Sequence, residues 1–424
     1  MAKITRRQLI YGTILGGIAG IFSSKNSLAA SPITATITSL QSSRVNFNLS
    51  STQSVKVYIE YGLRYGALTD KSRVVTFTKS ASLALTGLLP AKKYFYRIRY
   101  AFGSSTRYLV ASSGYFTTNA DSPHSVFAVQ ADPHMDENSD ANVYLGTLAQ
   151  IVAASPAFLL DLGDIFMVDK LKDKSESNIR ARFELMKGYY EKLQGIPLKI
   201  CLGNHDGELG YSKFNTKNFR KEYFPEQTGE LAYFSIDGPD QLHVVLDPFT
   251  YTTENPKSDG WQWTLGKAQY QWLEETLKNS KAKFKFVYIH HLLVGDATSR
   301  GGVEIAKYNE WGGLNQDGSD GFALHRSGWS MPVHQLLKNY GVSIVFKGHD
   351  HLYVKQELDG IIYQTVPQPS HPGFKVDPSQ YGYLSGKALG GSGFLKVSTD
   401  ADQIKVDFIQ YDGKVADSYI KIVE

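Results

Sequence analysis

This 424-residue chain has little cysteine, little excess charge and no long apolar run. Its single cysteine, Cys201, excludes an internal disulfide and a cysteine-rich zinc site, so any metal must be held by His, Asp, Glu or Asn. Residues 1–29 contain four basic side chains and no acidic one, which accounts for the whole net charge of +4. The remaining neutral body offers no broad electrostatic surface for nucleic acid or for an anionic membrane.

Histidine is absent from the first 123 residues, and all eleven histidines lie between His124 and His371. A chain of this length predicts two or three domains, at roughly 150 residues per domain. The composition, 42% hydrophobic and 20% charged, is that of a folded protein. We therefore expect at least two domains, with any histidine chemistry confined to the second.

The N-terminus has the layout of an export signal. Arg6 and Arg7 precede an uncharged stretch over residues 9–22, and small residues follow up to Ala29. This stretch is shorter than the roughly 20 residues that span a bilayer, and the arginine pair with its neighbours resembles the twin-arginine export signal. We expect residues 1–29 to be a cleaved signal peptide of a periplasmic or secreted protein, with no membrane anchor after cleavage. An uncleaved anchor is the alternative.

A first domain is predicted from alternation. Between about residues 33 and 118, apolar side chains such as Val45 and Phe47 alternate with polar ones. This period indicates half-buried antiparallel strands, and about seven of them predict a β-sandwich. Residues 85–98 resemble a fibronectin type III module, of the kind that precedes the catalytic domain of purple acid phosphatases. We place this all-β sandwich at residues 31–119 and expect a structural role for it.

The rest of the chain, residues 122–424, follows a different pattern. Apolar runs of strand length alternate with helix-like segments such as residues 265–277, which predicts an α/β domain. Residues 394–397 and 404–409 are expected to form strands that complete a sheet. The whole chain is therefore expected to be multidomain, an all-β sandwich followed by an α/β domain.

Five apolar runs of this domain each stop at a polar motif. The motifs are Asp132-Pro133-His134, Gly163-Asp164, Gly203-Asn204-His205-Asp206, His290-His291 and Gly348-His349-Asp350-His351. In α/β sheets ligands bind beyond the carboxyl ends of the strands, so side chains placed there can converge on one site. Together the motifs supply carboxylate, amide and imidazole donors suited to Mn, Fe or Zn.

The ordered set of motifs resembles the calcineurin-like metallophosphoesterase superfamily over about residues 122–372. The resemblance implies a β-sandwich flanked by helices and a metal-dependent phosphoric ester hydrolase. It assigns one metal ion to Asp132, His134, Asp164 and His351, and a second to Asp164, Asn204, His290 and His349. Asp164 would then bridge the two ions. The doubled histidine leaves His291 as an alternative to His290.

The preceding sandwich makes the chain most similar to purple acid phosphatases, but one of their ligands is missing. Their metal-ligating tyrosine falls three residues after Asp164, where this chain has Met167. His134 resembles instead a ligand found in members of the metallophosphoesterase superfamily that are not purple acid phosphatases. We therefore expect no tyrosinate colour, and an Fe(III) site loses its support.

The donor set suits phosphate chemistry. Only Asp132 and Asp164 among the proposed ligands are anionic, so two divalent ions leave the site positive and attractive to a phosphoester. Two metals roughly 3.5 to 4 Å apart lower the pKa of a bridging water, and the resulting hydroxide can attack the phosphorus. His205 is expected to act on the substrate as proton donor or oxyanion clamp, with loop support as the alternative. Asp206 and Asp169 are candidates to orient the His205 ring. We assign Asp206, together with His205, to the catalytic residues.

A glycine-rich segment, residues 295–330, separates two of the motifs. Long segments of this kind are commonly lids or specificity loops. Arg300, His325 or Arg326 could bind a phosphate oxygen, and a solvated surface insertion is the alternative.

We therefore expect an exported enzyme that hydrolyses small phosphomonoesters or phosphodiesters. The alternative is a secreted binding or adhesion protein with an inactive metallophosphoesterase domain. All seven ligand positions carry donor residues, which argues against this alternative.

Overall fold

The structure is a computed structural model. It describes residues 20–21, 32–40, 42–90, 92–118, 125–206, 217–224, 231–238, 240–251, 260–293, 300–373 and 377–423. The chain divides into two compact units, residues 1–122 and residues 123–424. The predicted signal peptide lies outside the described residues except for Gly20 and Ile21. Among the helices in the described ranges, none is both long enough and apolar enough to cross a membrane.

The first unit is built from strands that share one long member. They are β1 (Gly20–Ile21), β2 (Ile33–Leu40), β3 (Arg44–Gly62), β4 (Asp70–Lys71), β5 (Val75–Thr86), β6 (Lys93–Phe102) and β7 (Leu109–Thr117). The first half of β3 pairs with β2, its second half pairs with β4 and β6, and β5 pairs along both halves. An irregularity between Ser51 and Val55 separates the two halves.

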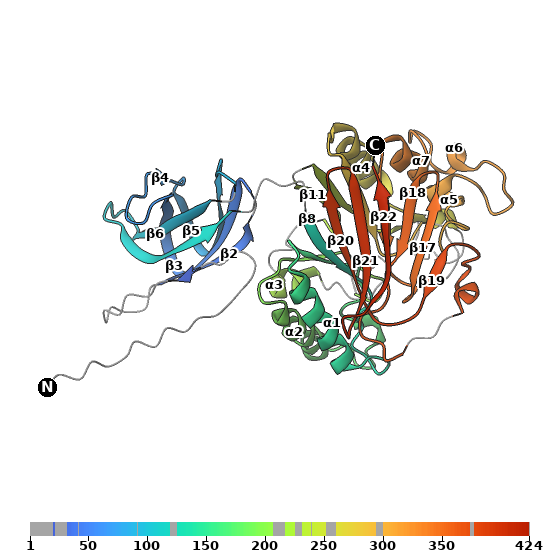
Figure 1. The fold of residues 1–424 in the computed structure, drawn as a ribbon, viewed down its shortest axis with the longest axis horizontal. Coiled ribbons are helices and arrows are strands. Elements are labelled where there is room, and N and C mark those ends of the chain that lie inside the picture. The colour runs from blue at the N-terminus through green and yellow to red at the C-terminus, as the bar shows by residue number, and fades with distance from the viewer. Residues whose placement is uncertain are drawn as a thin grey trace. The chain divides into compact units, whose positions relative to one another are not determined.

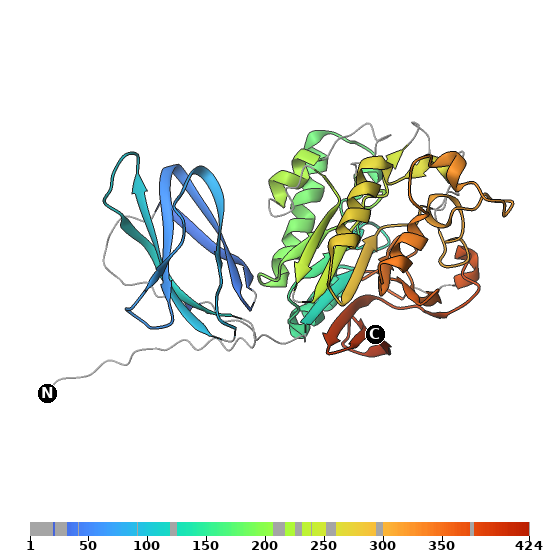
Figure 2. The same ribbon diagram turned by 90° about the horizontal axis from the view of Figure 1, so that it is seen from above.

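The two halves of β3 belong to layers that pack face to face (Figures 1 and 2). Phe47, in the first half, contacts the rings of Tyr96 on β6 and Phe116 on β7, with centroids 5.0 and 6.2 Å away. All three rings are buried. The strands predicted from alternation are confirmed, whereas the resemblance to fibronectin type III and the boundaries 31–119 stay predictions.

Two sheets form the centre of the second unit, with strand orders β10-β9-β8-β20-β21-β22 and β11-β12-β15-β16-β18-β17-β19. The first contains β8 (Ser125–Gln130), β9 (Leu159–Asp161), β10 (Leu198–Ile200), β20 (Gly393–Asp400), β21 (Gln403–Gln410) and β22 (Val415–Ile422). The second contains β11 (Phe234–Gly238), β12 (Gln241–Val245), β15 (Phe284–Ile289), β16 (Ile344–Lys347), β17 (Tyr353–Leu358), β18 (Ile361–Thr365) and β19 (Lys387–Leu389). A small ribbon joins β13 (Thr250–Tyr251) and β14 (Trp263–Thr264). Both strands predicted near the C-terminus are confirmed, as parts of β20 and β21.

Helices cover the outer faces of the paired sheets (Figure 2). They are α1 (Ala141–Ala154), α2 (Glu176–Tyr190), α3 (Lys217–Tyr223), α4 (Gly266–Asn279), α5 (Asn309–Gly312), α6 (Phe322–His325) and α7 (Val333–Asn339), with short 3₁₀ turns η1 (Val168–Lys170), η2 (Glu191–Leu193), η5 (Gly260–Gln262) and η6 (Pro378–Tyr381). Phe127 of one sheet and Phe286 of the other share a buried cluster, so the sheets pack on each other. Separate clusters join α1 and α2 to the first sheet and α4 and α7 to the second. This confirms the predicted β-sandwich flanked by helices.

The topology brings the polar motifs together. Strands β8, β9 and β10 are parallel neighbours, as are β15 and β16, so the segments that follow them leave at matching sheet edges. Glycines permit the close approach: a Cβ atom on Gly203 would lie 2.0 Å from the backbone nitrogen of Asp164, and one on Gly348 would lie 2.8 Å from Asp132 Oδ2. Side chains at these two positions would separate the loops that carry the motifs.

Candidate metal centre

Two groups of donor side chains lie at the ends of these strands. Asp132, His134 and His351 form the first group, and Asp164, His290 and His349 form the second. Within each group, one ligand atom from every residue lies within 4.8 Å of the others. All six were predicted from the sequence as ligands of two metals, with Asp164 assigned to both.

Asp164 lies between the two groups. Its Oδ2 atom is 3.7 Å from His134 Nε2 in the first group and 3.4 Å from His290 Nε2 in the second. Its Oδ1 atom accepts a hydrogen bond of 2.8 Å from the backbone N–H of His205, which fixes the carboxylate plane. One carboxylate oxygen therefore faces both groups, which is the placement required of a bridging ligand.

Asn204 joins the second group, and His290 rather than His291 faces it. Asn204 Oδ1 lies 3.0 Å from His290 Nε2, which also lies 3.2 Å from His349 Nδ1. His291 instead directs Nδ1 to the carbonyl of Leu292 at 3.0 Å. Two ring nitrogens and two oxygens thus point toward a common position in the second group.

The described residues fit a cation at the first group. Asp132 Oδ1 and His134 Nε2 are buried and have no hydrogen-bond partner among the residues that the structure describes. A buried polar atom without a partner is costly, and a cation would satisfy both atoms at once. The oxygen and imidazole donors suit Mn, Fe or Zn. Met167, where purple acid phosphatases have their tyrosine ligand, is buried and offers no oxygen.

Further contacts hold the side chains of the proposed ligands. His290 Nδ1 lies 2.8 Å from the carbonyl oxygen of Leu162, and His134 Nδ1 lies 3.4 Å from Asp136 Oδ2. These contacts leave each Nε2 atom facing the donor group, as is usual for metal-ligating histidines. Asp136 was not predicted, although its position two residues after His134 was the available signal.

Arg182, on α2, is a second supporting residue that was not predicted from the sequence. It donates hydrogen bonds of 2.9 Å to the carbonyl oxygen of Phe166, 2.8 Å to that of Met135 and 2.5 Å to that of His134. One guanidinium therefore joins the loops that carry His134 and Asp164. No local pattern singles out an arginine 48 residues from its partner.

The charges of the two groups support each other. Burial works against ionisation of Asp164, but His290 and His205 outweigh it and hold the pKa of this carboxyl well below its usual range. Burial also opposes the charging of His134, yet Asp136 and Asp164 raise its pKa to about 10. Burial holds the pKa of His351 well below its usual range. Protons on His134 and His290 must leave when a metal binds, so metal affinity rises with pH.

Most of the proposed ligands sit on strained backbone. Asp132, His134, Asp164, His349 and His351 all have positive φ, between 50° and 73°. Left-handed backbone costs a non-glycine residue roughly 1–2 kcal/mol, and such residues concentrate at functional sites. The strain aims five side chains inward, and no sequence pattern predicted it.

His205 lies beside the donor groups without belonging to either. Its Nε2 atom is 4.0 Å from Asp164 Oδ2, and its Nδ1 atom lies 2.8 Å from both carboxylate oxygens of Asp169. The side chain is 19% exposed, so a substrate can reach it. Of the two candidates to orient this ring, Asp169 makes the contact.

Asp206 has a different place from the one expected. Its carboxylate is buried and accepts hydrogen bonds from the backbone N–H groups of Gly203, Asp164, Ile165 and Phe166, at 2.7 to 3.0 Å. These bonds join the loop after β9 to the loop after β10. Asp206 therefore positions the Asp164 loop, and its assignment to the catalytic machinery stays a prediction.

Of the three cationic candidates in the segment 295–330, Arg300 lies next to a ligand. It donates a hydrogen bond of 2.9 Å to the carbonyl oxygen of His349 and lies 3.3 Å from Asp350 Oδ1. Arg326 is buried in an ion pair with Glu310, and His325 stacks on Trp261 with ring centroids 4.4 Å apart. Residues 295–299 lie outside the described residues.

Asp350, between the two ligands of the last motif, anchors a buried network that was not predicted. Its Oδ2 atom accepts from Lys347 Nζ at 2.6 Å, from the hydroxyl of Tyr383 and from the backbone N–H of Gly301 at 3.1 Å. Both charged side chains are fully buried. This network fixes the turn that presents His349 and His351.

The comparisons with known proteins agree with this geometry. Residues 125–353 match the family model of the calcineurin-like phosphoesterases. No curated protein matches the chain. A purple acid phosphatase, PPD1 from yellow lupin (Lupinus luteus) seeds, is 15% identical over 92% of this chain and 74% of its own, with a TM-score of 0.57. PhoD is 12% identical over 94% of this chain and 90% of its own, also with a TM-score of 0.57. At these identities the two structures show a shared fold.

Proposed function

The chain belongs to the calcineurin-like phosphoesterase family, and from that membership we propose that it is a binuclear-metal hydrolase of small phosphomonoesters or phosphodiesters. The observation that carries the proposal is the place of Asp164 Oδ2, within 3.7 Å of a donor atom in each group. A single structural ion would need only one of the two groups. Two groups sharing one carboxylate oxygen suit a pair of ions.

The protein's own residues supply positioning and a proton. When bound, two divalent ions provide a nucleophile at neutral pH and neutralise charge on the phosphoryl group. His205 is held by Asp169 through Nδ1, so its Nε2–H can protonate the leaving oxygen. Arg300, whose side chain is 31% exposed, is placed beside His349 to contact a phosphoryl oxygen.

Metal removal and reloading test the proposal. The purified full-length protein is assayed on p-nitrophenyl phosphate and bis(p-nitrophenyl) phosphate before chelation, after chelation, and after reloading with Mn, Fe or Zn. We expect about two metal ions per chain in the active form, loss of hydrolysis on chelation and recovery on reloading. Full hydrolysis by metal-free protein, or by protein with one ion per chain, contradicts the proposal.

We also propose that the chain is exported through the twin-arginine route, with cleavage near Ala29. Support comes from Arg6 and Arg7 ahead of a short apolar stretch. Replacing both arginines with lysine should leave uncleaved precursor inside the cell, measured by fractionation and N-terminal sequencing. Exported wild-type protein that begins at Met1 or Ala2 contradicts the cleavage.

A further inference from the structure

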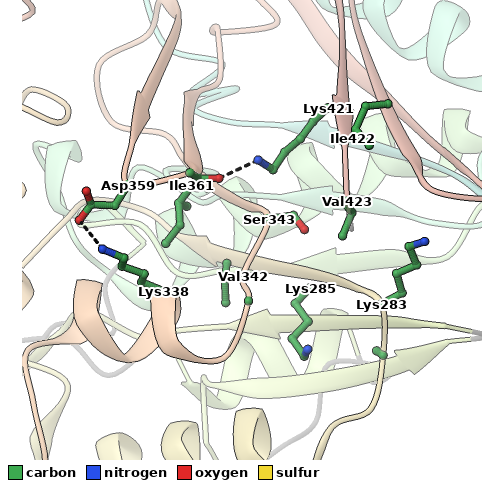
Figure 3. Close-up of a pocket in the computed structure, with 13 residues that line it drawn as sticks. Lys283, Lys285, Lys338, Val342, Ser343, Asp359, Ile361, Lys421, Ile422 and Val423 are labelled. Carbon is green, nitrogen blue, oxygen red and sulfur yellow. Dashed lines mark hydrogen bonds and ion pairs between the residues drawn. The ribbon is translucent and has the colours of Figure 1, made fainter.

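A concave site lies in the second unit, at the end of the β15-containing sheet that is opposite the proposed metal centre (Figure 3). It is a pocket of about 390 Å³. Its lysines come from three places: Lys283 and Lys285 at the start of β15, Lys338 on α7, and Lys421 on β22. Asp359 is the one carboxylate among the lining residues.

The pocket is remote from the metal centre. The proposed ligand His290 follows the C-terminal end of β15, whereas Lys283 and Lys285 lie at its N-terminal end. A six-residue strand rises about 20 Å. An ion bound among these lysines is therefore a separate ligand from one bound by Asp164 and its neighbours.

Two of the four ammonium groups are already engaged. Lys338 Nζ lies 3.4 Å from Asp359 Oδ2, and Lys421 Nζ donates a hydrogen bond of 2.6 Å to the carbonyl oxygen of Gly360 (Figure 3). These contacts hold both side chains along one side of the pocket. Asp359 also accepts from His334 Nε2 at 3.2 Å, so its negative charge is shared.

Lys283 and Lys285 are not engaged in this way. Neither side chain makes a hydrogen bond or ion pair with the residues that the structure describes, and both are only partly exposed. Asp240 Oδ1 accepts a hydrogen bond of 3.0 Å from the backbone N–H of Lys283. Burial lowers the pKa of Lys285, and Asp240 offsets only part of this effect. An anion in the pocket would relieve the cost of these partly buried charges.

We propose that this lysine pocket binds a phosphate-class oxyanion, either free phosphate or the terminal phosphate of a larger molecule. Lysine binds phosphate as a mobile point charge, which suits a pocket with four such groups and one carboxylate. The hydroxyl-bearing side chain of Ser343 also lines the pocket and can donate a hydrogen bond (Figure 3). The inference does not rest on the proposed function.

Residue-resolved lysine labelling tests it. The full-length protein is treated with a limiting amine-acetylating reagent in chloride, in inorganic phosphate and in tripolyphosphate at equal ionic strength, and each lysine is quantified by mass spectrometry. Phosphate should slow the labelling of Lys283 and Lys285 severalfold. It should leave Lys278 and Lys281, which lie outside the pocket, unchanged. Protection by tripolyphosphate alone identifies a larger phosphorylated ligand. The proposal is overturned if the anions protect Lys278 and Lys281 as strongly as Lys283 and Lys285, or if they protect none of these four lysines.

Variants provide a second readout by calorimetry. Replacing Lys283 and Lys285 together with glutamine should weaken binding of the protecting anion about tenfold, whereas replacing Lys278 and Lys281 together should not. Asp359→Asn should strengthen binding, because it removes the carboxylate that competes with the anion. Hydrolysis of p-nitrophenyl phosphate should stay at its wild-type value in all three variants. Unchanged affinity in the Lys283 and Lys285 double variant overturns the proposal.

Discussion

The two units of this chain use β-strands in opposite ways. In the first unit, strands alternate between buried and exposed positions, and their ends are joined by turns without chemistry. In the second, strands such as β9 and β16 are buried at every position, and polar side chains gather where they stop. Alternation therefore marks a scaffold, whereas continuous apolar runs that end in polar motifs mark a site. The comparison predicts that chemistry and stability can be disturbed separately.

Asp164→Asn should have the largest effect. The change keeps the shape but removes the negative charge that both donor groups face. Metal content and hydrolysis should fall together to background, measured by elemental analysis and with p-nitrophenyl phosphate. Asp140→Asn, at the N-cap of α1, is the matched control and should retain both. A metal-loaded, active Asp164→Asn protein breaks the model of a shared carboxylate.

His205→Ala should have the next largest effect, and its size should depend on the substrate. General acid catalysis contributes roughly 10² to 10⁴ in rate. Alkyl phosphates, whose leaving groups are poor as anions, should lose a factor in that range. p-Nitrophenyl phosphate should lose much less, with metal content unchanged. Equal slowing of both substrates assigns His205 to electrostatic or structural support instead.

Phe47→Ala tests the separation from the side of the scaffold. Phe47 is buried against Tyr96 and Phe116, so its truncation should cost the first unit about 3–5 kcal/mol of unfolding free energy. Tyr65→Ala, at a position 83% exposed, is the control and should change stability little. Metal content and hydrolysis should be unchanged in both variants. Loss of hydrolysis in Phe47→Ala would show that the chemistry of the second unit depends on the stability of the first.

The last prediction concerns His243, a buried histidine of the second unit, whereas the first unit contains no histidine. Burial lowers its pKa to about 3, below the value of about 6.5 in the unfolded chain. Between these pH values only the unfolded state binds the proton, so stability falls as the pH falls from 6.5. The slope from this residue is about 1.4 kcal/mol per pH unit.

His243→Gln removes the titrating group and keeps a polar partner for Tyr288 and Gln241. Chemical unfolding of the second unit at several pH values should show a shallower pH dependence in the variant. The first unit should show no such difference. Identical slopes in wild type and variant show that His243 is not the buried neutral group inferred here.

Sequence predicted the donors of the site better than their supports. Each donor stands directly after an apolar run, so a local pattern identifies it. The supports come from distant positions: Asp169 reaches His205 across 36 residues, and Arg182 reaches His134 across 48. Asp206 likewise contacts the backbone of the Asp164 loop across 40 to 42 residues, a partner that no local pattern indicates. Register and backbone handedness depend on the packed sheets, which local patterns do not contain.

The left-handed backbone at five of the proposed ligands lowers the stability of the fold in exchange for the placement of their side chains. Glycine would remove the steric strain at each of these positions, because it has no Cβ atom and adopts positive φ readily. A mutant library selected only for heat resistance should therefore favour glycine at a position such as His351. The selected protein would be more thermostable and would not hydrolyse phosphoesters. A survey that selects for hydrolysis should keep the strained side chain. Disagreement between the two selections would reveal the ligands with no metal measurement at all.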